Sequence, residues 1–506
     1  MTVLDQLLTG AMVKTALVGL VAGLAVYWLM HWRKTRKLPP GPLSLPFIGH
    51  LYLFKSTMIH EEIYKWTKKY GPVLSVAVGP FRFIMVNDID TALEVLVKKS
   101  TDFVNRMSSY SVDIFTDGGK DIAFAQYGPT LRLHRKIASK ALRQYMQGKD
   151  LENRVHIALQ KGIDLLKTEK EPFDPALHVT SMVFSLLFAL CFAESHDFQD
   201  PEFRRIIHIE DCLNEIFQSG LILEDYIPLL RYFPTKNFKQ FNALVKEHKA
   251  FLKKKFDEHK DSFDEGNIGD LTDYLIQVRK EAEQEDKEDL LEQLTETHLI
   301  QMLSDIFLAS FDTSRLTLRF ALFHMAQYPD IQEKVYKEIN EAVGTGRLPG
   351  MEDRENLGYT EAVLHESMRL ATVLPTGFPH IATCATKIGD YEIPKGTMVI
   401  INHWALHHDP QKWDEVEKFK PERYLTEGNK LGPKPESWLP FSAGRRLCLG
   451  EMVAKPELHL FFAGLIQRFM VKFPDGVVPD LTPKGGMVVL YPPDYKLIFE
   501  DRLPKT

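Results

Sequence analysis

The chain has 506 residues, of which 62 are basic and 68 acidic, so its net charge is −6 at pH 7. Nucleic-acid-binding proteins usually carry a basic domain, and this charge balance argues against nucleic acid as a partner. The four cysteines, Cys191, Cys212, Cys384 and Cys448, are scattered without a CxxC pair, so neither a disulfide framework nor a zinc site is indicated. Such cysteine usage fits a reducing compartment.

Residues 1–37 predict a membrane anchor followed by a basic stop. Residues 15–30 are almost wholly apolar, and five residues with basic side chains follow: His31, Arg33, Lys34, Arg36 and Lys37. The stretch is slightly shorter than the roughly 20 residues of a full span, although Trp28 and Trp32 supply interfacial anchors. The basic residues place the N-terminus in the lumen and the remainder in the cytoplasm. A cleavable signal peptide is the alternative, but bulky residues 27–29 do not suit a cleavage site.

Residues 38–50 predict a proline-rich hinge. Its core, Leu38-Pro39-Pro40-Gly41-Pro42, cannot continue a helix and favours a stiff extended turn. We interpret it as a lever that orients a globular domain against the membrane. Residues 51–506 predict one catalytic domain, because no Ser/Gly/Pro-rich linker divides them. Their pattern is mainly helical, with strand-like segments near residues 73–78, 81–86 and 396–402.

Residues 297–327 predict a long, largely apolar helix through the middle of the domain, where it would wall a cofactor. This helix carries Asp312 and Thr313, an adjacent acid and hydroxyl that can relay protons to a bound oxygen. Both residue types are poor in a helix interior unless their side chains find partners. The alternative is an ordinary threonine that hydrogen-bonds back to its own helix.

Glu366 and Arg369 lie three residues apart and share a helix face, so they are expected to pair. Arg423 is expected to reach the same carboxylate. When buried, such a trio costs much desolvation, and removal of one member is poorly tolerated. Its expected role is structural, holding the cysteine side of the fold in register; a surface pair is the alternative.

The segment Phe441-Ser442-Ala443-Gly444-Arg445-Arg446-Leu447-Cys448-Leu449-Gly450 predicts a haem-binding loop. A lone thiolate on a tight loop gives haem iron a strongly donating axial ligand, and thiolate ligation favours O–O cleavage over oxygen carriage. Gly444 and Gly450 are expected to allow backbone conformations and close approaches that a Cβ forbids. A buried, inert cysteine is the alternative.

The two haem propionates call for cations at the rim of the pocket. The candidates are Arg135, His380 and Arg446, each of which is otherwise an ordinary surface charge. A second set of cations is expected to form a basic patch for an acidic electron donor, unless it is only a solvated face. Its members are Arg132, Lys136, Lys140, Arg143, Arg445 and Lys455.

Together these motifs resemble the cytochrome P-450 superfamily, in its membrane-bound microsomal class, over essentially the whole chain. The cysteine loop matches the family pattern Phe-x-x-Gly-x-Arg-x-Cys-x-Gly at each fixed position: Phe441, Gly444, Arg446, Cys448 and Gly450. The resemblance implies a mainly α fold, a helical prism with small β-sheets. It also implies haem b (iron protoporphyrin IX) between the central helix and the cysteine loop.

The resemblance further implies monooxygenase activity on a lipophilic substrate, with electrons from NADPH through a flavoprotein, the NADPH–cytochrome P-450 reductase. Cytochrome b5 is a possible second donor. The implied location is the endoplasmic reticulum membrane, single-pass, with the catalytic domain cytosolic and in contact with membrane lipid.

The segments Val399–His408 and 438–441 resemble the steroid 17α-hydroxylase/17,20-lyase branch, which favours a steroid substrate. Residues 311–313 and 391–395 fit the related aryl-hydrocarbon hydroxylases equally well, so an aromatic or xenobiotic substrate is the alternative. Two departures from the family pattern stand out: Ser310 replaces a glycine near the iron, and Leu131 replaces a tryptophan that hydrogen-bonds a propionate. They favour the rival hypothesis of a non-catalytic haem-binding protein, whereas the retained Asp312 and Thr313 count against it.

Overall fold

The computed structural model describes residues 14–15, 18–19, 22–23, 26, 36–45, 48–53, 58–79, 81–145, 149–219, 222–485 and 488–502. Most of the predicted anchor, including Trp28 and Trp32, therefore lies outside the described residues. Among the described residues, no helix combines the length and apolar character needed to cross a membrane.

The described chain is mainly helical with small β-sheets, as the sequence predicts. The helices are α2 (Ile59–Tyr70), α3 (Ile89–Leu93), α4 (Tyr110–Phe115), α5 (Pro129–Tyr145), α6 (Asp150–Leu166), α7 (Ala176–Phe192), α8 (Pro201–Ser219), α9 (Leu223–Tyr226), α10 (Lys236–Ser262), α11 (Leu271–Gln284), α12 (Glu288–Leu291), α13 (Glu296–Gln327), α14 (Pro329–Ala342), α15 (Gly358–Ala371), α16 (His403–His407) and α17 (Glu451–Arg468). The strands are β1 (Val73–Val78), β2 (Phe81–Val86), β3 (Asn105–Arg106), β4 (His380–Ile381), β5 (Thr386–Ile388), β6 (Tyr391–Ile393), β7 (Met398–Ile401), β8 (Phe469–Lys472), β9 (Lys484–Gly485), β10 (Leu490–Tyr491) and β11 (Ile498–Asp501).

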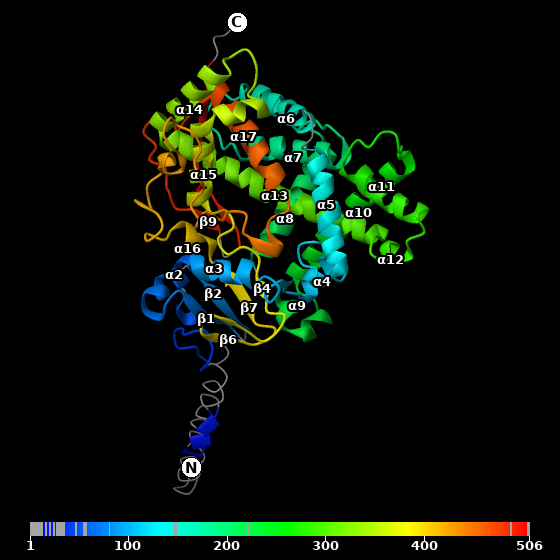
Figure 1. Ribbon diagram of the computed structural model, residues 1–506, viewed down its shortest axis with the longest axis vertical. Helices are drawn as coiled ribbons and strands as arrows, with labels where there is room; N and C mark the ends of the chain where they lie inside the picture. The colour runs from blue at the N-terminus through cyan, green and yellow to red at the C-terminus, as the bar shows by residue number, and fades with distance from the viewer. Residues whose placement is uncertain are drawn as a thin grey trace, which may run out of the picture.

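The central helix α13 confirms the prediction for residues 297–327. The Thr295 side chain accepts a hydrogen bond from the amide of His298 and so caps its start. The helix ends at Gln327, just before Pro329 begins α14. It contacts α7, α15, α17 and α10, and most of its residues are buried, as expected for a helix that is apolar on most faces. Figure 1 shows α13 in the middle of the molecule.

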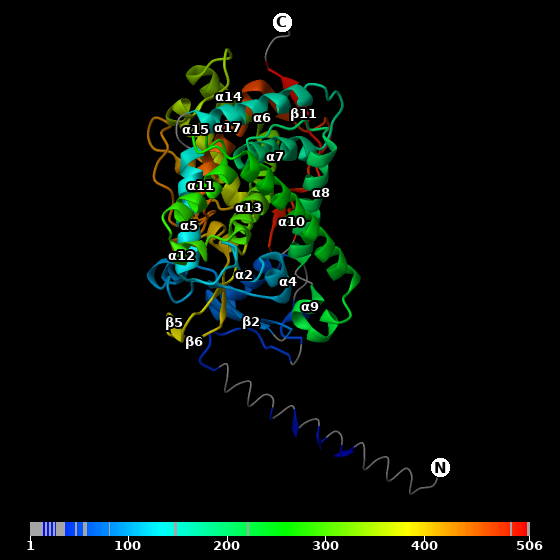
Figure 2. The same ribbon diagram turned by 90° about the vertical axis from the view of Figure 1, so that its right-hand side faces the viewer.

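The largest sheet lies at one end of the molecule, with α6 and α14 at the other (Figures 1 and 2). Its strand order is β1-β2-β7-β4-β3, with β1 and β2 antiparallel and β2 and β7 parallel. These three strands confirm the predicted segments near 73–78, 81–86 and 396–402. The pairing of β3 with β4 sets Arg106 opposite His380, which matters for the site described below.

The described part of the predicted hinge packs on this sheet. The amide of Ser75 in β1 donates to the carbonyl of Pro40 at 2.9 Å. A Cβ at Gly41 would lie 2.3 Å from the Ser75 carbonyl oxygen, so only glycine fits there. Lys37 adds an exposed ion pair with Glu392 at 2.8 Å. These contacts fix the direction in which the chain enters the domain.

Candidate functional site

The cysteine loop is pressed against the segment Glu94–Lys98. The amide of Cys448 donates to the carbonyl of Phe441 at 3.1 Å, which closes the loop just before α17. Gly444 has φ +76°, and a Cβ there would lie 1.8 Å from the carbonyl oxygen of Leu96. Both the left-handed backbone and the close approach require glycine at this position.

Gly450 differs from Gly444. Its backbone is ordinary, with φ −82°, and a Cβ there would meet no atom within 4 Å. The expectation that Gly450 relieves backbone strain is therefore not supported by its conformation. What glycine provides here is open space two residues from Cys448, which fits the close approach of a bulky planar group.

Cys448 is accessible, yet it is enclosed by protein. Burial raises the pKa of its thiol, while hydrogen bonds from the amides of Gly450 and Glu451 oppose that shift. Arg135 contributes in the same direction as these amides and donates to the carbonyl of Leu447 at 2.7 Å. An accessible sulfur surrounded by donors suits a thiolate ligand, because a bound metal deprotonates such a thiol.

The central helix presents an accessible stripe in the interior. Asp305 and Thr313 are half-buried and Ala309 is exposed, although most of α13 is buried. These residues are four apart, so they lie on one helix face. Half-buried Ser310 adjoins the stripe. Burial, with Asp121 nearby, raises the pKa of Asp305 well above its ordinary value.

The predicted acid and hydroxyl point to different partners. The Thr313 hydroxyl donates to the carbonyl of Ala309 at 2.8 Å, the back-bonded arrangement that the sequence left as the alternative. Asp312 is buried and accepts from the Nε of Arg315 at 2.8 Å. Burial raises the pKa of Asp312, and the charge of Arg315 partly offsets that shift.

The structure gathers three arginines and His380 beside the cysteine loop, and one of the arginines, Arg106, was not predicted. Arg106 is buried, and its Nε has no hydrogen-bond partner among the described residues. Burial and the charges of Arg446 and Arg135 lower its pKa to about 9. Burial and the charge of Arg106 likewise lower the pKa of His380 well below its usual value. Mutually repelling buried cations with an orphaned donor suit a carboxylate, so this cluster fits the two propionates of haem.

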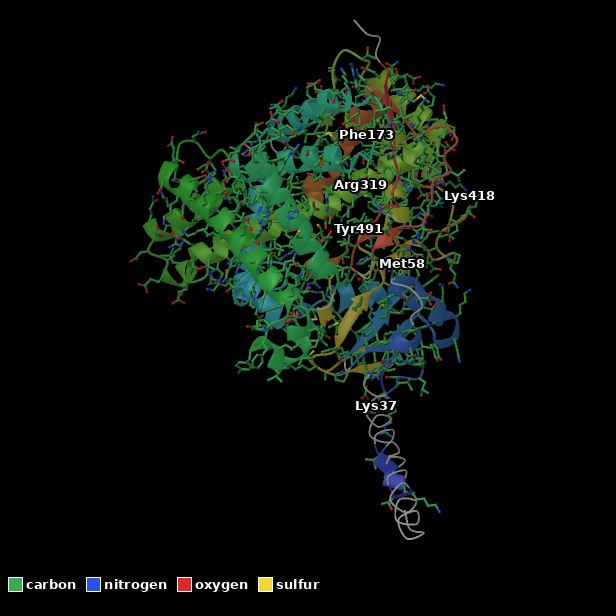
Figure 3. The ribbon with its side chains drawn as sticks, turned by 180° about the vertical axis from the view of Figure 1, so that it is seen from behind. Lys37, Met58, Phe173, Arg319, Lys418 and Tyr491 are labelled. Carbon is green, nitrogen blue, oxygen red and sulfur yellow. The ribbon has the colours of Figure 1, made fainter. Side chains whose placement is uncertain are left out.

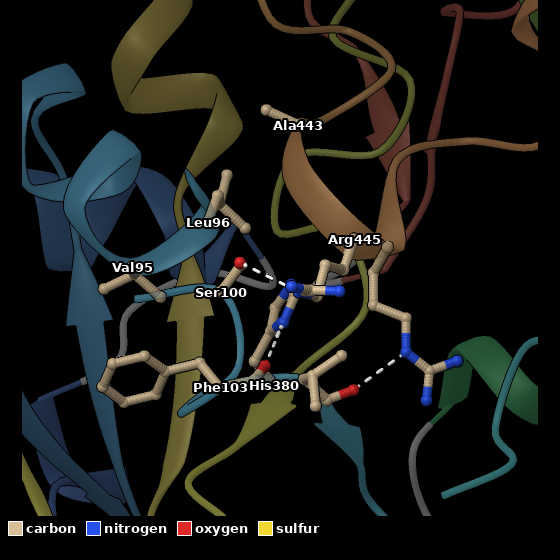
Figure 4. Close-up of a pocket in the computed structure, with 9 residues that line it drawn as sticks. Val95, Leu96, Ser100, Phe103, His380, Ala443 and Arg445 are labelled. Carbon is tan, nitrogen blue, oxygen red and sulfur yellow. Dashed lines mark hydrogen bonds between the residues drawn. The ribbon is translucent and has the colours of Figure 1, made fainter. Parts of the chain in front are cut away.

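Arg446 and His380 are held in place by backbone carbonyls. Arg446 donates to the carbonyls of Val104, Ile122 and Ala125, two of them at 2.8 and 3.0 Å. The Nδ1 of His380 lies 2.7 Å from the Phe103 carbonyl oxygen, as Figure 4 shows. Both side chains line a pocket whose volume, about 0 Å³, leaves no room even for a water molecule. That volume is below the roughly 300 Å³ of the smallest typical ligand sites, so this pocket by itself does not house a cofactor.

The structure brings Glu366, Arg369 and Arg423 together. Arg369 donates to both carboxylate oxygens of Glu366 at 2.8 and 2.9 Å, and Arg423 donates to one of them at 3.1 Å. Arg369 also donates to the carbonyl of His407 at 2.9 Å. The trio lies in the interior and joins α15 to the segment before the cysteine loop.

Phe441 is half-buried at the edge of the loop. Its ring lies 6.5 Å from that of Trp438, and the Nζ of Lys455 lies 5.0 Å from its centroid. Leu131, at the position of the family tryptophan, is buried and offers no indole donor. A leucine that packs in the core therefore stands where the family pattern has a tryptophan.

Residues 39–499 match the family model described as cytochrome P-450. The chain is also similar to proteins named steroid 17-alpha-hydroxylase/17,20 lyase from three animals. The protein of Squalus acanthias is 35% identical over 477 residues, which is 91% of this chain and 92% of that protein. The protein of Gallus gallus is 35% identical over 90% of both chains. The protein of Ictalurus punctatus is 36% identical over 91% of this chain and 90% of its own.

Proposed function

The chain belongs to the cytochrome P-450 family and is a monooxygenase, and from that membership we propose that its substrate is a steroid, hydroxylated at the 17α position. One observation supports the proposal of a steroid substrate. Several relatives that align over nine-tenths of the chain at about 35% identity bear the same steroid hydroxylase name. An apolar substrate of this kind also suits a chain with a predicted membrane anchor.

Haem is the cofactor that family membership implies, and this chain has the residues to hold it. Cys448 would provide the thiolate, while Arg106, Arg135, His380 and Arg446 would surround the propionates. When bound, haem supplies the activation of O2, so that one oxygen atom enters a C–H bond and the other leaves as water.

The protein's own contribution to the reaction is placement and proton control. The Gly450 and Glu451 amides stabilise charge on the Cys448 sulfur. Ala309 and Thr313 line the accessible helix face where the substrate would lie. Asp312, with a raised pKa, is the nearby group able to hold a proton and pass it on.

An NADPH-dependent flavoprotein reductase is the proposed electron donor, with cytochrome b5 as a second. The exposed side chains of Arg132, Lys136, Lys140 and Arg143 lie along α5. Arg132 and the exposed Arg445 of the cysteine loop both lie over the ring of Tyr127, at 5.9 and 5.8 Å. The helix and the loop therefore present a shared basic surface, which suits an acidic partner. Lys455 is half-buried beside Glu451 and adds less to it.

We also propose attachment to the endoplasmic reticulum membrane, with the catalytic domain in the cytosol. A cluster of exposed apolar side chains supports this attachment and consists of Leu223, Tyr226, Ile227, Leu229, Tyr232 and Phe233. The ring of Tyr226 lies 4.9 Å from that of Phe81 in β2, so the cluster adjoins the sheet. The hinge meets the same sheet through the Pro40–Ser75 hydrogen bond, which supports attachment at this end of the molecule.

Two measurements test this proposal. The carbon monoxide difference spectrum of the reduced protein reports whether a thiolate binds the iron, and Cys448→Ser should abolish the thiolate signal. Reconstitution with reductase and NADPH should convert progesterone to its 17α-hydroxylated product. Turnover of polycyclic aromatics without any steroid oxidation would refute the steroid assignment. A thiolate spectrum without any NADPH-dependent product would refute the assignment of monooxygenase activity.

A further inference from the structure

Arg315 ties the acid of the central helix to two neighbouring helices. It is 8% exposed, and its Nε and Nη2 both donate to the Oδ1 of Asp312, at 2.8 and 2.5 Å. Its Nη2 also donates to the Oδ1 of Asp211 in α8 at 2.7 Å. Its Nη1 lies 3.3 Å from the hydroxyl of Thr180 in α7. One guanidinium thus fixes the position of Asp312 relative to α7 and α8.

The two carboxylate oxygens of Asp312 differ in their surroundings. Oδ1 accepts both hydrogen bonds from Arg315, whereas Oδ2 is buried with no hydrogen-bond partner among the described residues. A buried carboxylate oxygen without a donor is costly unless it carries a proton or binds water. Oδ2 is therefore the atom at which a proton can be taken up and released.

An open cleft on the far side of Arg315 leads to solvent. It has a volume of about 400 Å³, and Arg315 and Asp211 are among its lining residues. Arg319 and Tyr491 also line it, and Figure 3 shows both on one side of the molecule. Arg319 lies one helical turn beyond Arg315 and makes its ion pair with Asp174, at 3.5 Å.

We propose that Arg315 is a positioning residue for the oxygenation: it holds Asp312 through Oδ1, ties it to Asp211 of α8 at the cleft, and so leaves Oδ2 as the atom that takes up and releases a proton. This inference rests on the proposed monooxygenase function. Arg315 keeps its own protons throughout, since a guanidinium does not ionise in proteins.

The charges around Asp312 set the sign of the expected effects. Arg315 faces it from α13, and Asp211 and Glu210 face it from α8, while Tyr491 of β10 faces Arg315. Burial raises the pKa of Asp312, Arg315 lowers it, and Asp211 and Glu210 raise it again. Loss of a close opposite charge shifts a carboxyl pKa by about 1–3 units. Arg315→Met should therefore raise the pKa of Asp312, and Asp211→Asn should lower it.

The first experiment needs no turnover. The unfolding temperature is measured from pH 5 to 8.5 for the wild type, Arg315→Met, Asp312→Asn and the double variant. A carboxyl with a raised pKa contributes stability at low pH that is lost as pH rises through that pKa. The deficit of Arg315→Met should therefore grow with pH and stop growing in the Asp312→Asn background. A deficit of equal size at every pH would mean that Arg315 only packs, and it would overturn the proposal.

The second experiment follows product formed per NADPH consumed as a function of pH. Arg315→Met should move the alkaline limb of the profile upward by about 1–3 pH units, because the proton donor stays protonated to higher pH, with steroid binding spectra unchanged within about twofold. Arg315→Lys, which keeps the positive charge, should show a pH profile close to that of the wild type. Asp211→Asn should move the same limb downward. This variant provides the test if Arg315→Met does not fold. Arg319→Met, in the same cleft, should behave as the wild type.

The outcomes separate this inference from the proposed function. A wild-type enzyme that oxidises steroids, with Arg315→Met and Arg319→Met giving the same profile, would overturn the role of Arg315 alone. A wild-type protein that oxidises no steroid would refute the proposed function. The unfolding series would then still decide whether Asp312 and Arg315 are linked.

Discussion

At the scale of single residues, the cysteine loop depends on Gly444 for two separable reasons. Its φ of +76° disfavours any side chain, and a Cβ would lie 1.8 Å from the Leu96 carbonyl oxygen. Gly396 shares the first constraint, with φ +81°, but a Cβ there would meet nothing within 4 Å. The two glycines therefore form a matched pair in which only one has a steric conflict.

We expect Gly444→Ala to lower the free energy of unfolding by about 3 kcal/mol and Gly396→Ala by about 1 kcal/mol, because backbone strain alone costs less than strain plus a backbone clash. Urea unfolding of both variants measures the difference. Equal losses of unfolding free energy would show that the Leu96 carbonyl moves away from the new Cβ at little cost.

Arg106 is the second residue whose role is local and testable. Its orphaned Nε and lowered pKa mark it as a buried cation that lacks an anion. A hydrogen bond to a charged group contributes about 1.5–3 kcal/mol. We therefore expect Arg106→Met to release haem about ten- to a hundredfold faster, measured by transfer to apomyoglobin. Arg132→Met, exposed on α5, is the control and should leave the rate unchanged. Equal rates in both variants would remove Arg106 from the propionate site.

At the scale of elements, the central helix and the cysteine helix are joined through a buried carboxyl. The hydroxyl of Ser314 in α13 donates to Glu457 in α17, and Glu457 is 7% exposed. Burial raises the pKa of Glu457 to about 7, which the Ser314 hydrogen bond only partly offsets. Because its ordinary pKa is 4.5, Glu457 stabilises the fold fully below about pH 4.5 and loses that contribution as pH rises through about 7.

Glu457→Gln should remove this pH dependence, because an amide stays neutral. Relative to the wild type, the variant should gain about 3 kcal/mol in unfolding free energy between pH 4.5 and 8.5. Urea unfolding at three pH values measures the gain. Glu451→Gln, on the first turn of the same helix, is the matched control for the change from carboxylate to amide. A constant difference for Glu457→Gln would contradict the shifted titration.

Local patterns in the sequence predict the elements better than the site. The apolar runs of α13, β1 and β2 are local, and the observed bounds agree within a residue. The Glu366–Arg369 pair also follows from helical spacing alone. Arg106 was missed because a two-residue strand, β3, has no local signal, and only its pairing with β4 brings Arg106 opposite His380.

The partner of Asp312 illustrates an intermediate case. Arg315 is a charged residue in an apolar helix, three positions after the acid, so the spacing itself could have indicated the pair. Asp211 belongs to α8, and its contact with Arg315 depends on how two helices pack. Sequence spacing therefore identifies pairs within an element, while contacts between elements need the fold.

At the scale of the whole molecule, the exposed apolar cluster within residues 223–233 and the large sheet share one end, and α6 lies at the other (Figures 1 and 2). Leu229 and Phe233 are 66% and 74% exposed, which is costly in water and favourable against lipid. Ile157 in α6 is 55% exposed and offers a comparison at the far end. The exposed apolar side chains at the sheet end thus predict that this end of the molecule faces the bilayer.

Hydrogen exchange of the full chain tests this orientation. Amides in residues 222–233 should exchange more slowly in lipid nanodiscs than in detergent, because insertion of the apolar side chains shields the backbone. Leu229→Glu with Phe233→Glu should abolish that protection, since burying a charge opposes insertion. Ile157→Glu should leave it intact, and α6 should exchange alike in both media. Protection of α6 in place of residues 222–233 would reverse the orientation and separate the membrane from the hinge end of the sheet.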